Sequence, residues 1–526
     1  MGAWIPASRS DGPKWAFPLV LLVATITRGI DLGRRSLWTD EASTWTAASL
    51  PFAELIQRCI HRDASPPLHY LLTKAAISRG DGETMLRLVP MLASLGLVWL
   101  TYRLARLGLP RGSSAFAALL VAISPFQIMY AQEARTYMTV ALFGVWATYL
   151  FARGIASDRN RAWPAYAAAM ALGLWTQSLA LLAVPAHGLI AISSARHRRR
   201  LWPWVLALVA AVLLYLPWAW ASREVSAQLA SSHWYIDEPD ALGVFKVLRA
   251  VLVTPLSIVT PLPGSPLPGL DQWMPRPIAW GLVALPAMLL LLFTLPLMLR
   301  QGGRGHLSRV AWAAWVVPIV LVFAVSFQKP LFLPRYFVFA TPYIAVLLAL
   351  SLAELRGVKP LRLALGGLVL ATSLLGLARY RADYTKEPWR EAVAHVESLA
   401  LPQQSLALVA YDADPFAYYV RHDPHPVEIH EVGHPDQPFA AAFTPAELDE
   451  LEAEARKVSA HYTEVWVLVR SANSEVRREV ARRAEYVASE GRTLVETRRW
   501  DSASGSVRGQ RYLRLDPADP DSSTSR

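Results

Sequence analysis

The feature that most constrains this chain is a series of apolar runs, each long enough to cross a membrane as a helix. A helix needs about 20 mostly apolar residues to span the ~30 Å hydrocarbon core of a bilayer. Of the 526 residues, 53% are hydrophobic and 18% are charged, which suits a membrane protein better than a soluble one. The sequence predicts eleven spans, near residues 15–30, 84–105, 113–130, 136–153, 162–177, 179–195, 202–220, 277–299, 310–327, 336–354 and 363–379.

Two parts of this pattern leave a choice. Only Gln177 and Ser178 separate the sixth run from the fifth, so this stretch fits either a short helical hairpin or one long helix. The first run follows a basic segment, 1–14, and is followed by Asp31, Arg34 and Arg35 rather than by a small-residue cleavage site. We therefore expect an uncleaved first span and not a removable signal peptide.

The loops between the runs predict the orientation. Basic residues are enriched in cytoplasmic loops of membrane proteins. With residues 1–14 in the cytoplasm, five short loops on that side are rich in Arg and nearly free of acids, whereas the acids gather in the opposite loops. Eleven spans then place the C-terminal region outside, as in a multi-pass protein of the plasma membrane (the inner membrane of a bacterium). The net charge of +11 follows from these loops, and we do not expect nucleic-acid binding.

Outside the spans, the sequence predicts two long outer loops and a separate domain. The loops are 31–82, with an amphipathic helix over 52–60, and 221–276, whose proline-rich end fits either a cover over a cavity or plain linkage. Residues 380–515 predict a small extracytoplasmic α/β domain, with strands over 406–411 and 465–469, helices over 445–460 and 474–489, and a helix opening at Glu387-Pro388-Trp389-Arg390. The tail, 516–526, has the composition of a disordered segment. Cys59 is the only cysteine, so no intrachain disulfide can form.

Asp40 and Glu41 lie just beyond the first run, where carboxylates are costly unless they have a role. One interpretation is structural: Asp40 caps a helix and Glu41 complements its dipole. The other is catalytic: one of them is a general base for an acceptor, or holds a metal. Because neighbouring residues of a helix point in different directions, we expect one of them to face a substrate, and we favour Asp40.

A second polar segment follows at Asp63-Ala64-Ser65-Pro66-Pro67-Leu68-His69. The two prolines stiffen the backbone, which can direct Asp63 and Ser65 toward a site, or can simply form a rigid turn. His69 could contact a substrate. A divalent metal is compatible with these residues, but they lack the paired spacing of a metal site.

Two further segments, 132–137 and 328–336, carry charged and aromatic residues on the same predicted side. Arginine here breaks the positive-inside trend, and its planar fork suits phosphate oxygens. Pairing of Glu133 with Arg135, and snorkelling of long side chains, are the structural alternatives. The candidate binding residues are Glu133, Arg135, Tyr137, Lys329, Arg335 and Tyr336.

No Walker A sequence, dinucleotide-binding glycine fingerprint or zinc-protease motif occurs in the chain. ATP-driven transport is therefore not expected, and a nucleotide-sugar donor is disfavoured because the acids face away from the cytoplasm.

Together these segments resemble a family. Trp38-Thr39-Asp40-Glu41-Ala42, the segment from Asp63 to Leu72, Arg87-Leu88-Val89-Pro90, the stretch from Ser124 to Tyr137 and Pro334-Arg335-Tyr336 are similar to motifs of the GT-C membrane glycosyltransferases. The likeness is to bacterial relatives of dolichyl-phosphate-mannose–protein mannosyltransferases and of the lipid A aminoarabinose transferase. It covers about 15–380, with Glu387-Pro388-Trp389-Arg390 as a weak match beyond.

The resemblance implies transfer of a monosaccharide from a polyprenyl-phosphate carrier outside the membrane, usually with inversion. Asp40 matches the family's candidate base, and basic residues bind the carrier phosphate. The chain departs from the aminoarabinose transferases at Ser65, where they have a lysine, so Arg135, Lys329 or Arg335 would bind the phosphate instead. The acceptor, which can be a protein, a lipid or a polysaccharide, is not implied. A flippase or transporter of lipid-linked sugars and a membrane assembly scaffold are the alternatives.

Overall fold

The computed structural model describes residues 12–63, 65–80, 82–156, 161–193, 195–231, 288–300, 302–326, 333–411, 413–423, 427–433, 443–470, 475–502 and 505–514. The chain folds into two compact units. The first, the membrane unit, is drawn from Met1–Gly33, Pro51–Val225 and Ile236–Asp383. The second, the C-terminal unit, is drawn from Arg34–Leu50, Ser226–Tyr235 and Tyr384–Arg526. Most of the predicted loop 221–276, Lys329 and the tail 516–526 lie outside the described residues.

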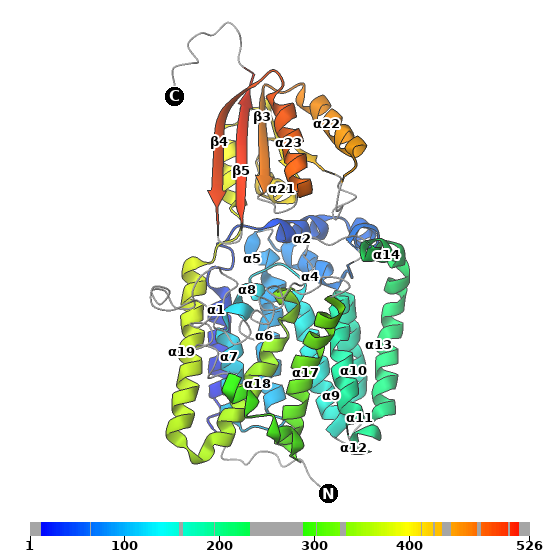
Figure 1. Ribbon diagram of the computed structural model, residues 1–526, viewed down its shortest axis with the longest axis vertical. Helices are drawn as coiled ribbons and strands as arrows, with labels where there is room; N and C mark the ends of the chain where they lie inside the picture. Colours follow the sequence, from blue (N-terminus) through cyan, green and yellow to red (C-terminus); the bar gives the residue numbers. More distant parts are fainter. Residues whose placement is uncertain are drawn as a thin grey trace. The chain divides into compact units, whose positions relative to one another are not determined.

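The described part of the membrane unit is helical (Figure 1). Shorter 3-10 or π segments are η1 (Cys59–Asp63), η2 (Ser178–Leu182), η5 (Pro296–Leu299), η6 (Pro334–Phe337) and η7 (Leu355–Gly357). The α-helices are α1 (Ala16–Gly29), α3 (Phe52–Arg58), α4 (Leu68–Ile77), α5 (Glu83–Leu86), α6 (Leu88–Ala105), α7 (Arg111–Ile123), α8 (Pro125–Ala131), α9 (Tyr137–Ala156), α10 (Ala162–Thr176), α11 (Ala183–Ile192), α12 (Ala195–Arg198), α13 (Leu201–Ala221), α17 (Gly303–Ser326), α18 (Ala340–Glu354) and α19 (Lys359–Asp383). Helix α14 (Arg223–Ser231) follows α13.

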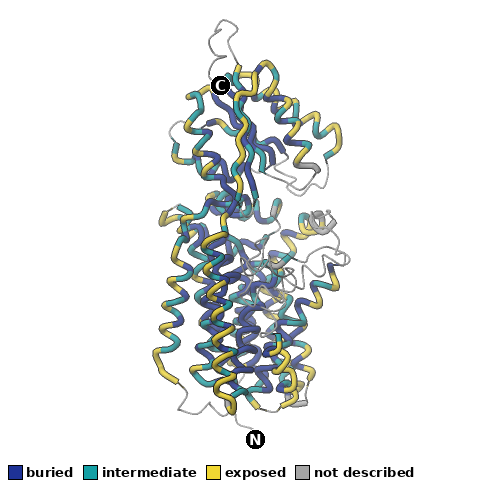
Figure 2. The backbone as a smooth tube through the Cα atoms, turned by 60° about the vertical axis from the view of Figure 1, so that its left-hand side comes forward, coloured by how far each residue is buried: buried dark blue, intermediate teal, exposed yellow. Residues whose placement is uncertain are grey.

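Several of these helices can cross a bilayer. Among the described residues, α6, α9, α13, α17 and α19 are long and apolar enough, and α7 with α8 forms a sixth candidate, bent by 59°. Shorter apolar helices cover Ala16–Gly29, Ser178–Ile192, Met288–Leu299 and Ala340–Glu354. Exposed residues run along the outer helices, and buried residues concentrate in the inner ones (Figure 2). The predicted class, a multi-pass helical membrane protein with a small C-terminal α/β region, is confirmed, while the number of eleven spans stays a prediction.

The stretch 162–195 is two helices. Helix α10 ends at Thr176, Gln177 is extended with φ −168° and ψ 141°, and α11 begins at Ala183 after a 3-10 turn. The alternative of one long helix is therefore wrong. At the break, the side-chain Oε1 of Gln177 accepts a hydrogen bond from Thr136 Oγ1 at 3.0 Å.

The bend between α7 and α8 has a clear cause. Pro125 has no N–H to bond the carbonyl of Val121, and Ser124 caps the new helix by accepting from Gln127 N at 3.4 Å. Arg28, fully buried on α1, replaces the missing donors: its guanidinium donates to Val121 O at 3.1 Å and to Ala122 O at 2.8 Å. A buried backbone carbonyl needs such a partner in a membrane.

The C-terminal unit is an α/β sandwich around a five-stranded sheet of order β2-β1-β3-β5-β4. Strands β2, β1 and β3 are parallel to one another. Strand β5 pairs antiparallel with β3, and β4 pairs antiparallel with β5. Alternate buried residues of β1 and β3 belong to two different apolar clusters. One cluster includes residues of α22 and α23, and the other includes residues of α20 and α21. The strands are β1 (Ser405–Ala410), β2 (Glu428–Val432), β3 (Glu464–Arg470), β4 (Thr493–Asp501) and β5 (Ser506–Leu513), and the helices are α20 (Trp389–Leu399), α21 (Asp414–Val420), α22 (Pro445–Ser459) and α23 (Glu475–Ser489).

One segment joins this unit from far away in the sequence. Residues 34–50, with helix α2 (Thr39–Ser49), belong to the C-terminal unit and not to the membrane unit. Local sequence patterns place this segment in one outer loop with residues 51–82, because they cannot show which distant residues it packs against.

We predict that Arg28→Met lowers the free energy of unfolding, because Val121 O loses the Arg28 donor and Ala122 O is left with the hydrogen bond from Thr27 Oγ1. The expected cost is about 1–3 kcal/mol for each carbonyl left without a partner. Thermal unfolding in detergent would measure it, with Thr25→Val as control, since exposed Thr25 bonds only Leu21 O in its own helix. An unfolding midpoint equal to that of the control would contradict the role of Arg28.

We also predict a pH effect at Glu397 of α20. Burial, together with a hydrogen bond to Asp423 and its charge, raises the pKa of Glu397 to about 7. A raised folded-state pKa means that stability is fully present below the unfolded pKa of ~4.3 and is lost as the pH rises through about 7. Glu397→Gln should therefore raise the unfolding midpoint relative to wild type at pH 8 but not at pH 4. Exposed Glu454 provides the control, as Glu454→Gln should show no such difference.

Candidate functional site

Asp40 lies in the first turn of α2, in the C-terminal unit. The N-cap of α2 is Trp38, and no side chain caps the helix, so the capping role considered for Asp40 is not what the structure shows. Asp40 and Glu41 are the acids of the first turn, where the helix dipole favours negative charge. The two differ in burial: Glu41 is fully buried and Asp40 is partly exposed.

Glu41 faces a cation. Its Oε2 lies 2.6 Å from Lys386 Nζ, and both side chains are almost inaccessible, at 0% and 2% exposure. The next residue, Glu387, accepts hydrogen bonds from Thr39 N and Thr39 Oγ1 at 3.4 and 3.3 Å. Sequence reasoning marked Glu387 only as a weak match and missed Lys386, since nothing local links them to α2.

The residues on either side of the double proline, Pro66-Pro67, lie in the membrane unit. Ser65 is half-buried, Asp63 ends the π-helix η1, and the side chain of Asp63 lies outside the described part. His69 is fully buried at the start of α4, and its Nδ1 lies 3.2 Å from Thr139 Oγ1. Burial and the nearby charge of Arg135 lower the pKa of His69 to about 3, against a smaller opposing effect of the Ala134 carbonyl. His69 is therefore neutral at physiological pH.

The turn between α8 and α9 carries Glu133, which is buried, and Arg135, which is half-buried. Gln132 fixes the start of this turn: its Nε2 donates to Arg28 O at 2.9 Å and to Ile30 O at 2.8 Å, and its Oε1 accepts from Tyr380 at 3.1 Å. The Arg135 amide bonds Glu133 O at 2.7 Å. The broken α7–α8 span thus ends in a rigid polar turn.

Arg335, Tyr137 and Tyr336 come together from two distant segments. The Arg335 guanidinium lies 5.8 Å from the centre of the Tyr137 ring, and the Tyr137 and Tyr336 rings are 6.3 Å apart. Tyr130, which the sequence did not single out, stacks edge-on against Tyr137 at 5.7 Å and lies within electrostatic range of Glu133 and Arg335. The Gln127 amide donates to Val338 O at 2.7 Å, which ties α8 to the segment that carries Arg335.

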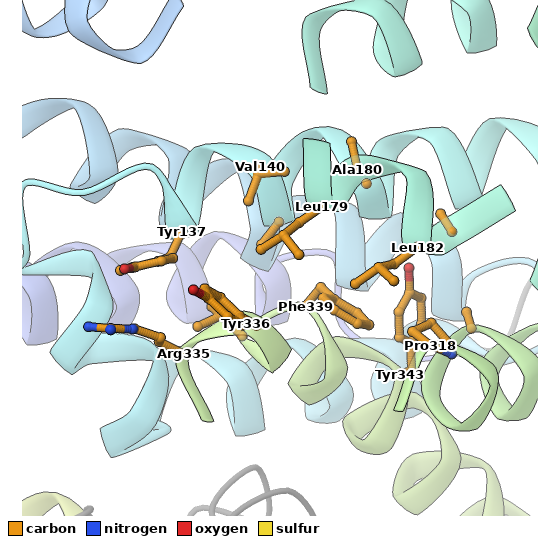
Figure 3. A pocket seen from close by; sticks show the side chains of 15 residues that line it. Tyr137, Val140, Leu179, Ala180, Leu182, Pro318, Arg335, Tyr336, Phe339 and Tyr343 are labelled. Carbon is orange, nitrogen blue, oxygen red and sulfur yellow. The ribbon is translucent and has the colours of Figure 1, made fainter. Parts of the chain in front are cut away.

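These residues form one end of a cavity inside the membrane unit (Figure 3). The space within the cavity and its opening that protein atoms do not occupy is about 480 Å³, part of which is open to solvent. Arg335, Tyr137 and Tyr336 are grouped at one end, and the wall continues through apolar side chains. The remaining lining residues are Val140, Ala141, Gly144, Leu179, Ala180, Leu182, Ala183, Ala314, Pro318, Val338, Phe339 and Tyr343.

A buried polar chain begins at Tyr343 in this wall. Its hydroxyl donates to Thr148 at 2.9 Å, and Thr148 lies 3.1 Å from His187 Nε2. His187 Nδ1 lies 3.1 Å from the hydroxyl of Tyr166, which accepts from Trp204 at 3.0 Å. The chain satisfies polar atoms on five helices and holds them together, as buried polar side chains do between membrane helices.

The structure thus assembles the predicted residues into two groups, one in each unit. Asp40 and Glu41 belong to the C-terminal unit, whereas His69 with Arg135 and Tyr137 with Arg335 and Tyr336 belong to the membrane unit. Lys329 lies outside the described residues. Among the residues that are described, no group of three or more His, Cys, Asp or Glu could hold a metal ion.

Comparison with known proteins identifies the fold. Residues 64–220 match the model of the family described as dolichyl-phosphate-mannose-protein mannosyltransferase. No curated protein matches the sequence.

Solved structures match nearly the whole chain. ArnT from Cupriavidus metallidurans, in the apo state, has 16% identity and a TM-score of 0.58 over 94% of this chain and 97% of that one. The same protein bound to undecaprenyl phosphate has 15% identity and a TM-score of 0.56, over 94% and 98%. The oligosaccharyltransferase of Archaeoglobus fulgidus, in complex with Zn and sulfate, has 14% identity and a TM-score of 0.53, over 86% and 67%. The chain therefore has the fold of the GT-C membrane glycosyltransferases, as its motifs suggested, and over residues 64–220 its sequence matches one family of them.

Proposed function

We propose that this protein transfers a monosaccharide from a polyprenyl-phosphate carrier to an acceptor at the outer face of the plasma membrane. The observation that carries the proposal is the cavity of the membrane unit, which is apolar along its length and has Arg335 at one end. A polyprenyl phosphate has the matching chemistry: a long apolar tail with an anionic head.

The comparisons support this choice of donor. The structure of ArnT, whose fold this chain shares, is described with undecaprenyl phosphate bound. In our proposal the isoprenoid tail occupies the apolar wall, and Arg335 binds the phosphate through the planar fork of its guanidinium. Tyr137 stacks near this cation and helps to orient it. Arg135 and Lys329 remain candidate phosphate ligands, Glu133, Tyr336, Ser65 and His69 candidate contacts to the substrate, and Asp63 a second candidate acid.

The chemistry needs a base and a stabilised leaving group. Asp40 accepts a proton from the acceptor hydroxyl or amine as that group attacks the anomeric carbon. The bond from this carbon to the phosphate oxygen breaks, and its electrons leave with the polyprenyl phosphate. Arg335 stabilises the charge that develops there. His69 is neutral and buried, and because its pKa is lowered to about 3 it is a weak base in comparison with an ordinary histidine.

The first test is the replacement of the base. Asp40→Asn should lower the rate by a factor of about 10²–10⁴ and leave donor binding intact, because the amide cannot accept the proton. Release of polyprenyl phosphate by purified protein in nanodiscs, with a panel of polyprenyl-phosphate sugars, would measure it. Mass spectrometry would report bound donor.

Glu54→Gln is the matched control, as Glu54 is an exposed acid of the same predicted loop. Near-normal turnover by Asp40→Asn would show that another group is the base. Neither binding nor consumption of any donor by the wild type would favour a transporter or a scaffold.

The second test alters the cationic end and the lining of the cavity separately. Arg335→Ala removes a charged hydrogen-bond donor, which is worth about 1.5–3 kcal/mol, or roughly 10- to 100-fold in donor affinity. Gly144→Leu fills the apolar wall, since a Cβ built at Gly144 meets no atom within 4 Å. We expect both variants to bind undecaprenyl phosphate more weakly.

Gly367→Leu is the control, because Gly367 in α19 is equally open but does not line the cavity. Unchanged affinity in Gly144→Leu would mean that the tail lies elsewhere, and unchanged affinity in Arg335→Ala would remove its phosphate role.

A further inference from the structure

The two residues that flank Asp40, Thr39 and Glu41, are bound by two consecutive residues of the C-terminal unit. Glu41 pairs with Lys386 at 2.6 Å, and Thr39 donates twice to Glu387, from its backbone N and from Oγ1. Lys386 and Glu387 lie between α19 and α20, more than 340 residues further along the chain. The backbone of Asp40 is thus fixed on both sides by one short linker.

The pair of Glu41 and Lys386 is not explained by stability. Removing two charges from water costs several kcal/mol per ion, and a buried pair is often no more stabilising than apolar residues of similar size. What such a pair provides is geometry, since neither charge can leave its partner without a large penalty. Glu41 and Lys386 have 0% and 2% exposure, so this penalty applies to both of them.

Glu387 connects α2 to the centre of the sheet. Its Oε2 also accepts from Trp389 Nε1 at 3.1 Å, and its Oε1 lies 2.7 Å from Arg470 Nε. Arg470 is the last residue of β3. The carboxylate is itself almost fully buried and lies at the start of α2, where a negative charge complements the helix dipole.

Helix α2 also occupies the edge of the sheet at which such domains bind ligands. In open α/β sheets that site lies at the carboxyl ends of the parallel strands, where the strand order reverses. With the order β2-β1-β3, the reversal lies between β1 and β3. Helix α21 begins directly after β1, and α2 packs on it (Figure 1). Thr46 Oγ1 donates to Asp414 at 2.7 Å, and the Trp45 and Tyr418 rings meet edge-on at 5.2 Å.

The segment that precedes α2 is bound by the same unit. The Leu37 amide donates to the hydroxyl of Tyr419 at 2.7 Å, and the Arg390 amide donates to Ser36 Oγ at 3.2 Å. Arg390 also donates to Arg34 O at 2.6 Å. Side chains and backbone of the C-terminal unit therefore bind the whole segment 34–46, as they would bind a peptide ligand.

We infer that the C-terminal unit is the positioning domain for Asp40, and that Lys386 and Glu387 are its positioning residues. The inference rests on the proposed function, because it takes Asp40 to be the base. A misplacement of about 1 Å can cost a factor of 10² in rate, so the hold on Asp40 controls turnover rather than donor affinity.

The test compares Lys386→Met and Lys386→Arg in the full-length protein in nanodiscs. Hydrogen exchange of the α2 amides reports the hold directly, without any substrate. We expect exchange of α2 to be at least about 10-fold faster in Lys386→Met, and kcat for the donor that the wild type consumes to fall by about 10²-fold with little change in KM. Lys386→Arg keeps the charge, so we expect its α2 exchange rate and its kcat to be close to those of the wild type. If Lys386→Met does not fold, the double variant Glu41→Gln/Lys386→Met, which removes both charges of the pair, is measured in its place.

Arg511→Met is the matched control. Arg511 forms a 2.5 Å pair with fully buried Glu464 in the same unit, away from α2. It should lower the unfolding midpoint without changing kcat or exchange of α2.

Wild-type exchange in Lys386→Met, an equal loss of kcat in Arg511→Met, or a rise in acceptor KM alone would overturn the inference. An active Asp40→Asn with fast exchange in Lys386→Met would instead show that the base assignment is at fault and the hold on α2 is real. No donor consumption by the wild type would contradict the proposed function, and the exchange result would still decide whether Lys386 holds α2.

Discussion

The break in the α7–α8 span is the constraint on which the candidate site of the membrane unit depends. A proline inside a membrane leaves carbonyls without donors, and bilayer lipids offer none. Arg28 supplies them from α1, where it is fully buried. Because the break is satisfied in this way, α8 can turn by 59° and present the Glu133–Arg135 turn, and Gln127 can tie the segment carrying Arg335 to the same helix.

The two units carry different parts of the proposed chemistry. The membrane unit holds a cavity whose cationic and aromatic end suits a phosphate and whose apolar wall suits a lipid tail. The C-terminal unit holds the carboxylate proposed as the base. In the proposed mechanism this division gives the C-terminal unit a role in turnover, since a proton acceptor is effective only within hydrogen-bond reach of the group that it deprotonates.

In the C-terminal unit, two charged residues bind the residues on either side of Asp40. Lys386 and Glu387 have opposite charge, and each binds a neighbour of Asp40. Lys386 pairs with Glu41, and Glu387 accepts hydrogen bonds from Thr39 at the start of α2. An apolar contact could bury the same surface, but it would let α2 slide or rotate. The ionic contacts specify one orientation, in which Glu41 is turned inward and Asp40 is left partly exposed.

Much of this protein is determined by the sequence itself. Apolar runs of membrane length predict the helices, because a bilayer demands them, and the continuous apolar strands around Leu408 and Val467 predict the buried sheet. Asp40, Arg335 and Tyr137 were predicted as site residues from residue type, predicted side and resemblance to a family, and their roles stay predictions. The break at Gln177, the partner of Glu41, the donors at Val121 and Ala122, and the joining of 34–50 to the C-terminal unit were decided only by the tertiary structure. Each depends on contacts between residues tens to hundreds of positions apart, which no local pattern of hydrophobicity or charge encodes.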